Sequence, residues 1–216
     1  MLKAGIVSYE AGLKVQDAAR DFVAKGVFDG VLILLEHYPV ITVGKAGGAD
    51  NVRISSRDMK ERGIEIFHSS RGGNVTCHSP GQLVGYPILN LSCWQEDIHW
   101  YVRTLEDLLI RVLQDFTLRG EQKAPYSGVW IRDKKVAAIG VSARSWITGH
   151  GFALNVCNDL NLFQEIVPCG IREFGVTSIS NAKGQQVEVS SAENLLTQSF
   201  KNVFECTLET IKLQPR

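Results

Sequence analysis

The sequence predicts a single α+β domain, in which helices pack against a mixed or antiparallel β-sheet. The length of 216 residues suits one large domain, since domains usually hold roughly 100 to 200 residues. Segments with strand patterns come in groups and do not alternate strictly with helical segments, which argues against a doubly wound parallel sheet. No internal repeat, low-complexity tract or linker divides the chain. We therefore place one domain over residues 1–216.

The first predicted element is a helix over residues 9–26, where apolar side chains recur at helical spacing and Gly26 marks the end. Residues 30–44 contain two apolar, β-branched runs separated by Pro39, which predict a pair of strands. A short capped helix over residues 55–63 and a strand over residues 64–67 follow.

Residues 82–91 predict a further strand, in which Gly85 and Pro87 indicate a bulge or an edge position. The clearest helix covers residues 94–116, whose apolar positions recur at steps of three and four, so that it should lie across the sheet. Residues 127–141 then predict two strands around a turn at Asp133-Lys134.

A strand over residues 150–156 comes next, and the last predicted element is a helix over residues 190–211. This helix opens on a capping-box pattern, in which Ser190 is followed three residues later by Glu193. Its apolar face would include Cys206 as a core residue.

Charge and composition narrow the function. The chain has 23 Lys+Arg and 23 Asp+Glu, so nothing in the balance favours nucleic acid as a partner. No apolar run approaches the ~20 residues that a membrane span requires, and the N-terminus lacks the pattern of a signal peptide. We expect a cytoplasmic protein that does not bind membranes. The 5 cysteines contain no Cys-x-x-Cys pattern, which argues against a bound metal and a disulfide framework.

Two segments could carry chemistry. Residues 70–82 place two glycines after Arg71 and a histidine, His78, before a second turn. They read equally as a ligand-binding loop or as a glycine-rich connection with a surface arginine. The chain has no phosphate-binding Gly-x-x-x-x-Gly-Lys-Ser/Thr motif and no Gly-x-Ser-x-Gly elbow. Thiol chemistry at Cys169, between Pro168 and Gly170, is the sharper alternative.

A free thiol has a pKa of ~8.5, so a neighbouring ammonium would be needed to favour the reactive thiolate. Lys134 and Lys135 are candidates, and strand alternation allows only one of them to face the active side of the sheet. The remaining cysteines, Cys93, Cys157 and Cys206, suit small core positions. Cys77 is next to His78, but neighbours in a strand point to opposite faces.

Four segments in this order, residues 71–91, 127–141, 150–156 and 166–171, resemble the lipoyl(octanoyl) transferases. The early segment at residues 37–45 also looks like this family's opening strand pair. The resemblance implies a biotin/lipoate-protein-ligase-like catalytic domain. Two positions depart from the family pattern: Cys77 stands where an aromatic residue is usual, which would loosen the pocket, and Ser79 stands where glycine is common.

The resemblance also implies residue roles. Cys169 would carry the acyl group as a thioester, and Lys135 would lower the pKa of its thiol, so that the two form a Cys-Lys dyad. Lys134 would be a solvated turn residue. The walls of the acyl-substrate pocket would be Arg71, Gly72, Gly73, Asn74, Val75, Thr76, Cys77, His78, Ala138, Ile139, Gly140, Gly151, Phe152 and Ala153.

The implied enzyme is an octanoyl-[acyl-carrier-protein]:protein octanoyltransferase, which needs no cofactor and acts first in endogenous protein lipoylation. It would take an octanoyl or lipoyl group from acyl carrier protein and transfer it to a lysine of a lipoyl domain. Acceptors would be 2-oxoacid dehydrogenases or the glycine cleavage H protein, and we expect a monomer. Backbone N–H groups near Cys169 would stabilise the oxyanion, with the side chains of His78 and His150 as alternatives. The alternatives are an ATP-dependent lipoate or biotin ligase and a non-catalytic module that binds carrier protein.

Overall fold

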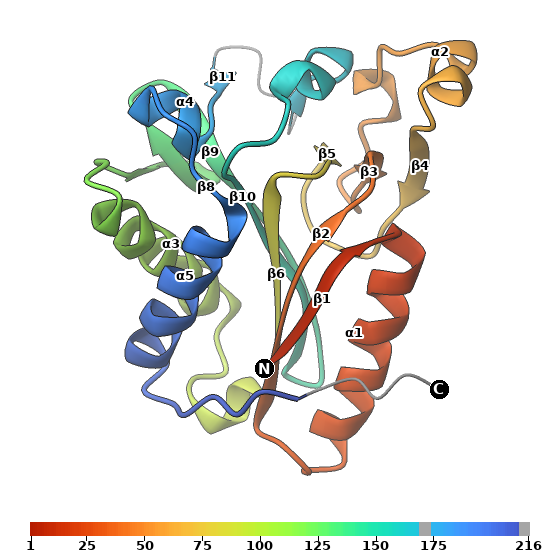
Figure 1. The fold of residues 1–216 in the computed structure, drawn as a ribbon. Helices are drawn as coiled ribbons and strands as arrows, with labels where there is room; N and C mark the ends of the chain where they lie inside the picture. The colour runs from red at the N-terminus through yellow and green to blue at the C-terminus, as the bar shows by residue number, and fades with distance from the viewer. Residues whose placement is uncertain (169–173, 212–216) are drawn as a thin grey trace.

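The computed structural model describes residues 1–168 and 174–211. Cys169, the predicted nucleophile, lies outside the described residues. Two sheets organise the described part of the chain (Figure 1). The larger sheet has the strand order β1-β2-β6-β10-β9-β8-β7, with β11 paired to β9, and the smaller has the order β4-β3-β5. Both are mixed, because β1 pairs with β2, β11 with β9 and β3 with β4 in parallel, while the other pairs are antiparallel.

The strands of the larger sheet are β1 (Leu2–Val7), β2 (Gly30–His37), β6 (Gln82–Leu89), β7 (Glu121–Lys123), β8 (Tyr126–Ile131), β9 (Lys134–Arg144), β10 (Ile147–Asn155) and β11 (Gly175–Val176). Those of the smaller sheet are β3 (Val40–Val43), β4 (Glu65–His68) and β5 (Val75–His78). The helices are α1 (Tyr9–Ala24), α2 (Ser56–Glu61), α3 (Ile98–Asp115), α4 (Ile179–Lys183) and α5 (Val189–Val203), with short 3₁₀ turns η1 (Ala49–Asn51), η2 (Leu91–Cys93) and η3 (Leu160–Glu165).

Helices cover both faces of the larger sheet. Figure 1 shows α3 and α5 on one side of it and α1 on the other. The apolar stripe of α3 is fully buried, from Tyr101 and Leu105 to Leu113, as its spacing predicts. α1 begins at Tyr9 because the hydroxyl of Ser8 accepts a hydrogen bond from the N–H of Ala11. The single mixed α+β architecture predicted from the sequence is therefore confirmed.

Several local predictions are wrong. The two runs around Pro39 form strands, but β2 and β3 belong to different sheets and do not pair. The hairpin turn lies at Arg132-Asp133, one residue earlier than predicted, because Ile131 pairs with Lys134. The capping box does not form, since the N-cap of α5 is Glu188 and Ser190 lies inside the helix.

The end of the last helix also differs from the prediction. α5 ends at Val203, so Cys206 follows the helix, although it still packs against the core.

Pro87 also lies where the sequence does not predict it, because β6 is a central, fully buried strand. The pairing of β6 with β10 stops at Gly85, so the absent N–H of Pro87 removes no bond from that ladder. The Thr148 hydroxyl replaces the ladder there: it donates to the carbonyl of Pro87 at 2.6 Å and accepts from the N–H of Leu89 at 2.8 Å. A buried side chain thus satisfies backbone groups that a neighbouring strand would otherwise pair.

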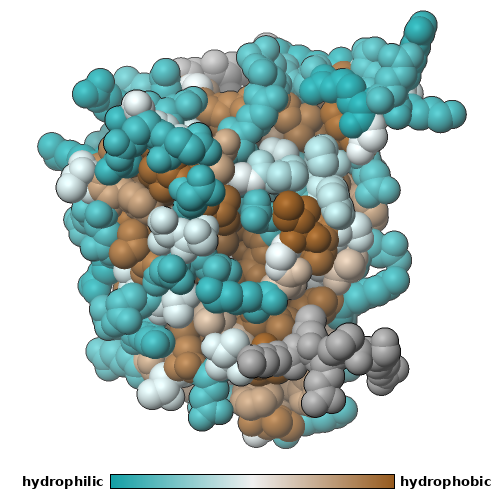
Figure 2. Space-filling view, viewed as in Figure 1, coloured by the Kyte–Doolittle hydropathy of each residue, from teal (hydrophilic) through white to brown (hydrophobic). Residues whose placement is uncertain are grey.

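The surface of the molecule carries both polar and apolar side chains. Figure 2 shows polar side chains over much of one face, with apolar patches between them. Within residues 1–168 and 174–211, no helix has the length and apolar character needed to span a bilayer.

Candidate active site

A small open pocket, with a cavity volume of about 50 Å³, lies where the small sheet meets the large one. Its walls come from the glycine-rich segment, from β5, from the middle of β9 and from β10. Among the predicted residues, the lining includes Arg71, Gly73, Asn74, Thr76, His78, Ala138, Ile139, Gly140, Gly151, Phe152 and Ala153. The sequence analysis did not assign Tyr9, Val84 and Tyr86 to this pocket, although they line it together with His150. Tyr9 lies outside the segments that carry the family resemblance, whereas Val84 and Tyr86 lie within residues 71–91. The fold brings all three to the pocket.

Strand alternation divides β5 between pocket and core. Thr76 and His78 face the pocket, whereas Val75 and Cys77 are fully buried among apolar side chains such as Ile41. Val75 and Cys77 therefore do not line the pocket, and Cys77 does not loosen its wall. Gly72 also lies outside the lining, but its N–H donates to the carbonyl of Val141 at 2.8 Å and ties the glycine-rich segment to β9.

Arg71 is a buried pocket residue and not a surface arginine, with 8% of its area exposed. Its guanidinium donates to the carbonyl of Thr42 at 2.7 Å and to the hydroxyl of Thr42 at 2.8 Å. Glycines make room for it: a Cβ on Gly44 would lie 2.8 Å from Nη1 of Arg71, and one on Gly140 would lie 3.2 Å from Cδ. The ligand-loop interpretation of this segment therefore fits the structure better than a glycine-rich surface connection.

A chain of hydrogen bonds determines the tautomer of His78. The Asn155 amide must donate to the carbonyl of Thr177 at 2.9 Å, so the oxygen of Asn155 faces Gln82 and accepts from its Nε2 at 2.8 Å. Consequently the oxygen of Gln82 faces Nδ1 of His78 at 2.7 Å, and Nδ1 must carry the proton. Nε2 of His78 is left as a hydrogen-bond acceptor.

Three histidines near the pocket are held neutral by burial. The pKa of His78 is lowered to about 3, mainly by burial and to a smaller extent by His37 and Arg71. Desolvation likewise lowers the pKa of His37 to about 4, and that of His150 to about 4 with a contribution from the Arg71 charge. Their partners suit neutral rings: His37 contacts the Tyr86 hydroxyl at 2.7 Å, and His150 contacts the Ser70 hydroxyl at 2.9 Å.

A second, smaller pocket adjoins the first, because Thr76, Ala138 and Ala153 line both. It contains Lys135 and Pro168, the residue directly before Cys169. The two pockets therefore share a wall, and together they extend from the glycine-rich segment to Pro168.

A β-bulge aims Lys135 into this second pocket. Trp130 pairs with Lys135 and Val129 with Ala137, so Val136 is an extra residue in β9. Val136 and Ala137 both pack in the core under α3, and Lys135 lies with its ammonium 4.7 Å from the centre of the Trp130 ring. Lys135 is 8% exposed, whereas Lys134 is exposed at the start of the strand.

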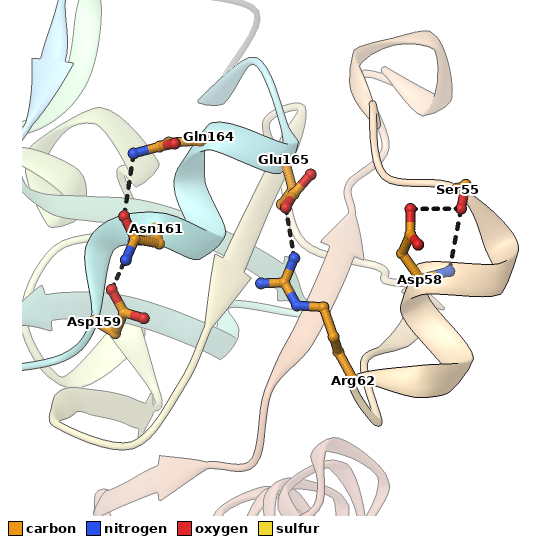
Figure 3. A network of polar contacts seen from close by, with 7 residues as sticks. All are labelled: Ser55, Asp58, Arg62, Asp159, Asn161, Gln164 and Glu165. Carbon is orange, nitrogen blue, oxygen red and sulfur yellow. Dashed lines mark hydrogen bonds and ion pairs between the residues drawn. The ribbon is translucent and has the colours of Figure 1, made fainter.

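The chain that leads to Pro168 is anchored before it reaches the pocket (Figure 3). Arg62 forms an ion pair with Glu165 of η3, and the Asp159 carboxylate caps Asn161 at the start of this turn. The N–H of Val167 donates to the carbonyl of Asn51 at 2.8 Å. These contacts hold the start of the segment that contains Cys169 against η1 and α2.

The other cysteines have environments that suit the protonated thiol. Burial raises the pKa of Cys77 well above its ordinary value, and desolvation is also the main cause of the raised pKa values of Cys93, Cys157 and Cys206. At Cys206 the positive charges of Lys201 and the N-terminus oppose this rise, but burial is the larger effect, so none of the four described cysteines has the lowered pKa of a reactive thiol.

Comparison with known structures gives the fold. The chain is similar to a bi-partite lipoate protein ligase from Thermoplasma acidophilum, with a TM-score of 0.75 and 18% identity, over 98% of this chain and 86% of the other. A lipoate-protein ligase A bound with ATP gives a TM-score of 0.74 at 17% identity, over 98% and 87% of the two chains. Biotin protein ligase from Aquifex aeolicus is more distant, with a TM-score of 0.53 at 11% identity, over 95% and 68%.

Sequence comparison gives the family. Residues 8–201 match the lipoyl protein ligase A/B catalytic domain. The chain is 47% identical to an octanoyltransferase of Clostridium kluyveri over 203 residues, 94% of this chain and 87% of that protein. It is 44% identical to an octanoyltransferase of Caldanaerobacter subterraneus over 213 residues, 99% of this chain and 93% of that protein. The chain therefore belongs to the octanoyltransferase family, within the lipoyl protein ligase A/B catalytic-domain fold.

Proposed function

We propose that this acyltransferase moves an octanoyl or lipoyl group from acyl carrier protein to a lysine of a lipoyl domain, through a thioester on Cys169. The observation that carries the proposal is the shared pocket of Lys135 and Pro168, which has Thr76, Ala138 and Ala153 in common with the larger pocket. Family membership supports the acyl group and the reaction class. The ligase-like neighbours share less than a fifth of their residues with this chain and support the fold alone.

The larger pocket suits an acyl chain. Val84, Ile139 and Phe152 contribute apolar surface to it. Burying each methylene of the chain would contribute about 0.8 kcal/mol, so an eight-carbon group would gain several kcal/mol. The thioester carbon would then lie toward the second pocket, beside Lys135 and Pro168.

The reaction would proceed in two balanced steps. The Cys169 thiolate adds to the carbonyl carbon of the donor thioester, and collapse of the intermediate breaks the bond to the carrier sulfur, which takes a proton from the Lys135 ammonium. The acceptor lysine amine then attacks the acyl-enzyme and passes its proton to the Lys135 amine as the Cys169 thiolate leaves. The second step restores the starting charges, and neither step requires ATP.

Thr76 is the side chain best suited to donate a hydrogen bond to the thioester carbonyl. It is 7% exposed, lines both pockets, and its hydroxyl has no hydrogen-bond partner within the described part of the chain. His78 and His150 suit this role less well. His78 presents an acceptor nitrogen, and the accessible nitrogen of His150 contacts Ser70.

We further propose that the acceptors are the lipoyl domains of 2-oxoacid dehydrogenases or the glycine cleavage H protein, and that the enzyme acts as a cytoplasmic monomer without a cofactor. An acidic partner would meet only some of the basic residues around the two pockets. Arg71 and Lys135 are buried, while Arg57 and Arg62 form ion pairs with Glu61 and Glu165. The exposed Lys134 and Arg53 remain available to such a partner.

Intact mass spectrometry tests the proposed function. Wild-type protein incubated with octanoyl-carrier protein and no ATP should gain one octanoyl group that hydroxylamine removes. The Cys169→Ser variant should gain none, whereas Cys157→Ser, which alters a cysteine outside both pockets, should behave as wild type. An ATP requirement, or an adduct that survives Cys169→Ser, would refute the thioester mechanism and favour a ligase.

A further inference from the structure

A separate cavity lies at the end of the molecule that is opposite the candidate active site. Its volume is about 780 Å³, compared with about 50 Å³ for the larger pocket of that site. Among the described residues, none that lines this cavity also lines either pocket. Figure 1 shows the N-terminus and the segment after α5 at this end of the molecule, and β11 at the other end. The proposed reaction does not use this cavity.

The cavity presents apolar surface at two levels. Its floor consists of Leu32 of β2, Leu89 of β6 and Phe200 of α5, which belong to the hydrophobic core and are at most 2% exposed. Above the floor, Trp94 is partly exposed and Phe28 is 42% exposed. Hydrogen bonding fixes the wall at Trp94, because its Nε1 donates to a main-chain carbonyl after α5 at 2.9 Å. The apolar surface is therefore formed before any ligand arrives.

The chain that follows α5 closes one side of the cavity. It runs below the start of β1 (Figure 1) and is bonded to the N-terminus there. The N-terminal ammonium of Met1 donates to the carbonyl of Glu209, and the N–H of Ile211 donates to the carbonyl of Met1 at 2.7 Å. Leu2 and Ile211 also form an isolated parallel bridge. These bonds give the cavity a defined wall on this side.

The rim of the cavity, made by Asp29, Glu205 and Glu209, is acidic. All three are exposed, and within the described part of the chain none of them takes part in an ion pair. No described lining residue is a lysine, arginine or histidine, although Lys201 of α5 acts electrostatically on a lining cysteine. The ammonium of Met1 is bonded to the Glu209 carbonyl, and burial lowers its pKa against the opposing charge of Glu209. The rim therefore carries an excess of negative charge.

We propose that this cavity binds a small amphipathic cation, whose ammonium or guanidinium group lies at the acidic rim and whose apolar body packs on the floor. The volume is within the range of about 300 to 1,000 Å³ that small-ligand sites occupy. Charge complementarity selects a cation, because the acidic rim repels carboxylates and phosphates. The apolar body supplies most of the affinity, since exposed carboxylates contribute modestly and are screened by salt.

A matched pair of probes tests the role of charge. Tryptamine is a cation at pH 7, and tryptophol is a neutral molecule of nearly the same shape. Protein labelled with ¹⁵N at tryptophan gives one indole signal for each of the 4 tryptophans. Trp94→Phe assigns the signal that comes from the cavity. Trp130, which lies beside Lys135, reports on binding at the candidate active site.

Tryptamine should shift the Trp94 signal, leave the Trp130 signal in place, and bind about tenfold more tightly than tryptophol. Equal affinities of the two probes would overturn the proposal, as would a shift of Trp130 without a shift of Trp94. This comparison uses the wild-type protein, so it does not depend on the folding of a rim variant. It also needs no acyl transfer, so its outcome is separate from that of the proposed function.

Two substitutions at the rim and one control locate the charge. Asp29→Asn and Glu205→Gln should each weaken tryptamine binding about fivefold and leave tryptophol binding unchanged. Glu65→Gln removes the same charge from exposed β4, away from the cavity, and should have no effect. Unchanged tryptamine affinity in both rim variants would contradict the proposal.

The same signal distinguishes two other occupants. Tryptamine binding that appears only after residues 212–216 are removed would show that the basic end of the chain fills the cavity. Binding of an acetylated Leu-Lys-Leu-Lys-Leu peptide, without binding of tryptamine, would indicate a segment of a protein partner. Either result would overturn the assignment of a small ligand.

Discussion

Acidification should destabilise this protein well before its surface carboxylates are protonated. His37, His78 and His150 are 0%, 6% and 3% exposed, and burial lowers their pKa values to about 4, 3 and 4. In the unfolded chain these groups have ordinary pKa values of about 6.5. The perturbation is a change of pH from 8 to 5.5, which protonates the unfolded histidines and leaves the folded ones neutral.

The direction follows from proton linkage. Between about pH 6.5 and pH 4 the unfolded state binds more protons than the folded state, so the free energy of unfolding falls as the pH falls. One pH unit below the unfolded pKa, each histidine removes about 1.4 kcal/mol, and three such groups remove about 4 kcal/mol. Domains are commonly stable by only about 5 to 15 kcal/mol, so this loss is large.

Urea denaturation at pH 8, 7, 6 and 5.5 measures the effect directly. The midpoint should fall steadily from pH 6.5 downward at a constant slope with urea concentration. In His37→Gln the pH-dependent loss should shrink by about a third, since one of three similar groups no longer binds a proton. A free energy of unfolding that changes by less than about 1 kcal/mol between pH 8 and pH 5.5 would refute the burial argument.

Three further outcomes are expected. Thr148→Val should lower the free energy of unfolding by about 2 kcal/mol, because the buried N–H of Leu89 loses its acceptor. Thr148→Ser keeps the hydroxyl and should lower it less. Equal melting temperatures for the two variants would contradict this expectation. Thr76→Val should lower the rate of acyl-enzyme formation about 100-fold, and Thr76→Ser should restore most of that rate. An unchanged rate in Thr76→Val would argue against a contact between Thr76 and the thioester carbonyl. In ¹⁵N-labelled protein, His78 should show the proton on Nδ1, and replacing Gln82 with methionine should disturb that tautomer; a proton on Nε2 in the wild type would contradict the hydrogen-bond chain.

Sequence patterns were reliable where residues close together in the sequence determine the local structure. The periodicity of α3 depends on side chains a few residues apart, so its effect can be read along the sequence. The family resemblance, carried by ordered motifs, was likewise present in the sequence and agrees with the relatives found. Local signals failed at the capping box of α5, where Ser190 was one plausible start among several.

Contacts between distant segments were beyond the reach of the sequence. Whether β2 and β3 share a sheet depends on which partners complete each strand, and β3 pairs with β5, a strand much later in the chain, with Thr42 opposite Thr76. Alternation correctly excluded contact between Cys77 and His78, but the side that faces the pocket became known only from the packing of Cys77 against Ile41.

The sequence by itself therefore determined the fold class, the family and the candidate Cys-Lys chemistry, because motifs and periodicity are local properties. The tertiary structure decided how the site is assembled. A single extra residue, Val136, turns Lys135 toward the pocket, and Gly128 on the next strand donates its N–H to the buried carboxylate of Glu106 from α3. A bulge and a buried charge across a sheet depend on the pairing of distant strands, and strand pairing follows from the free energy of the whole core.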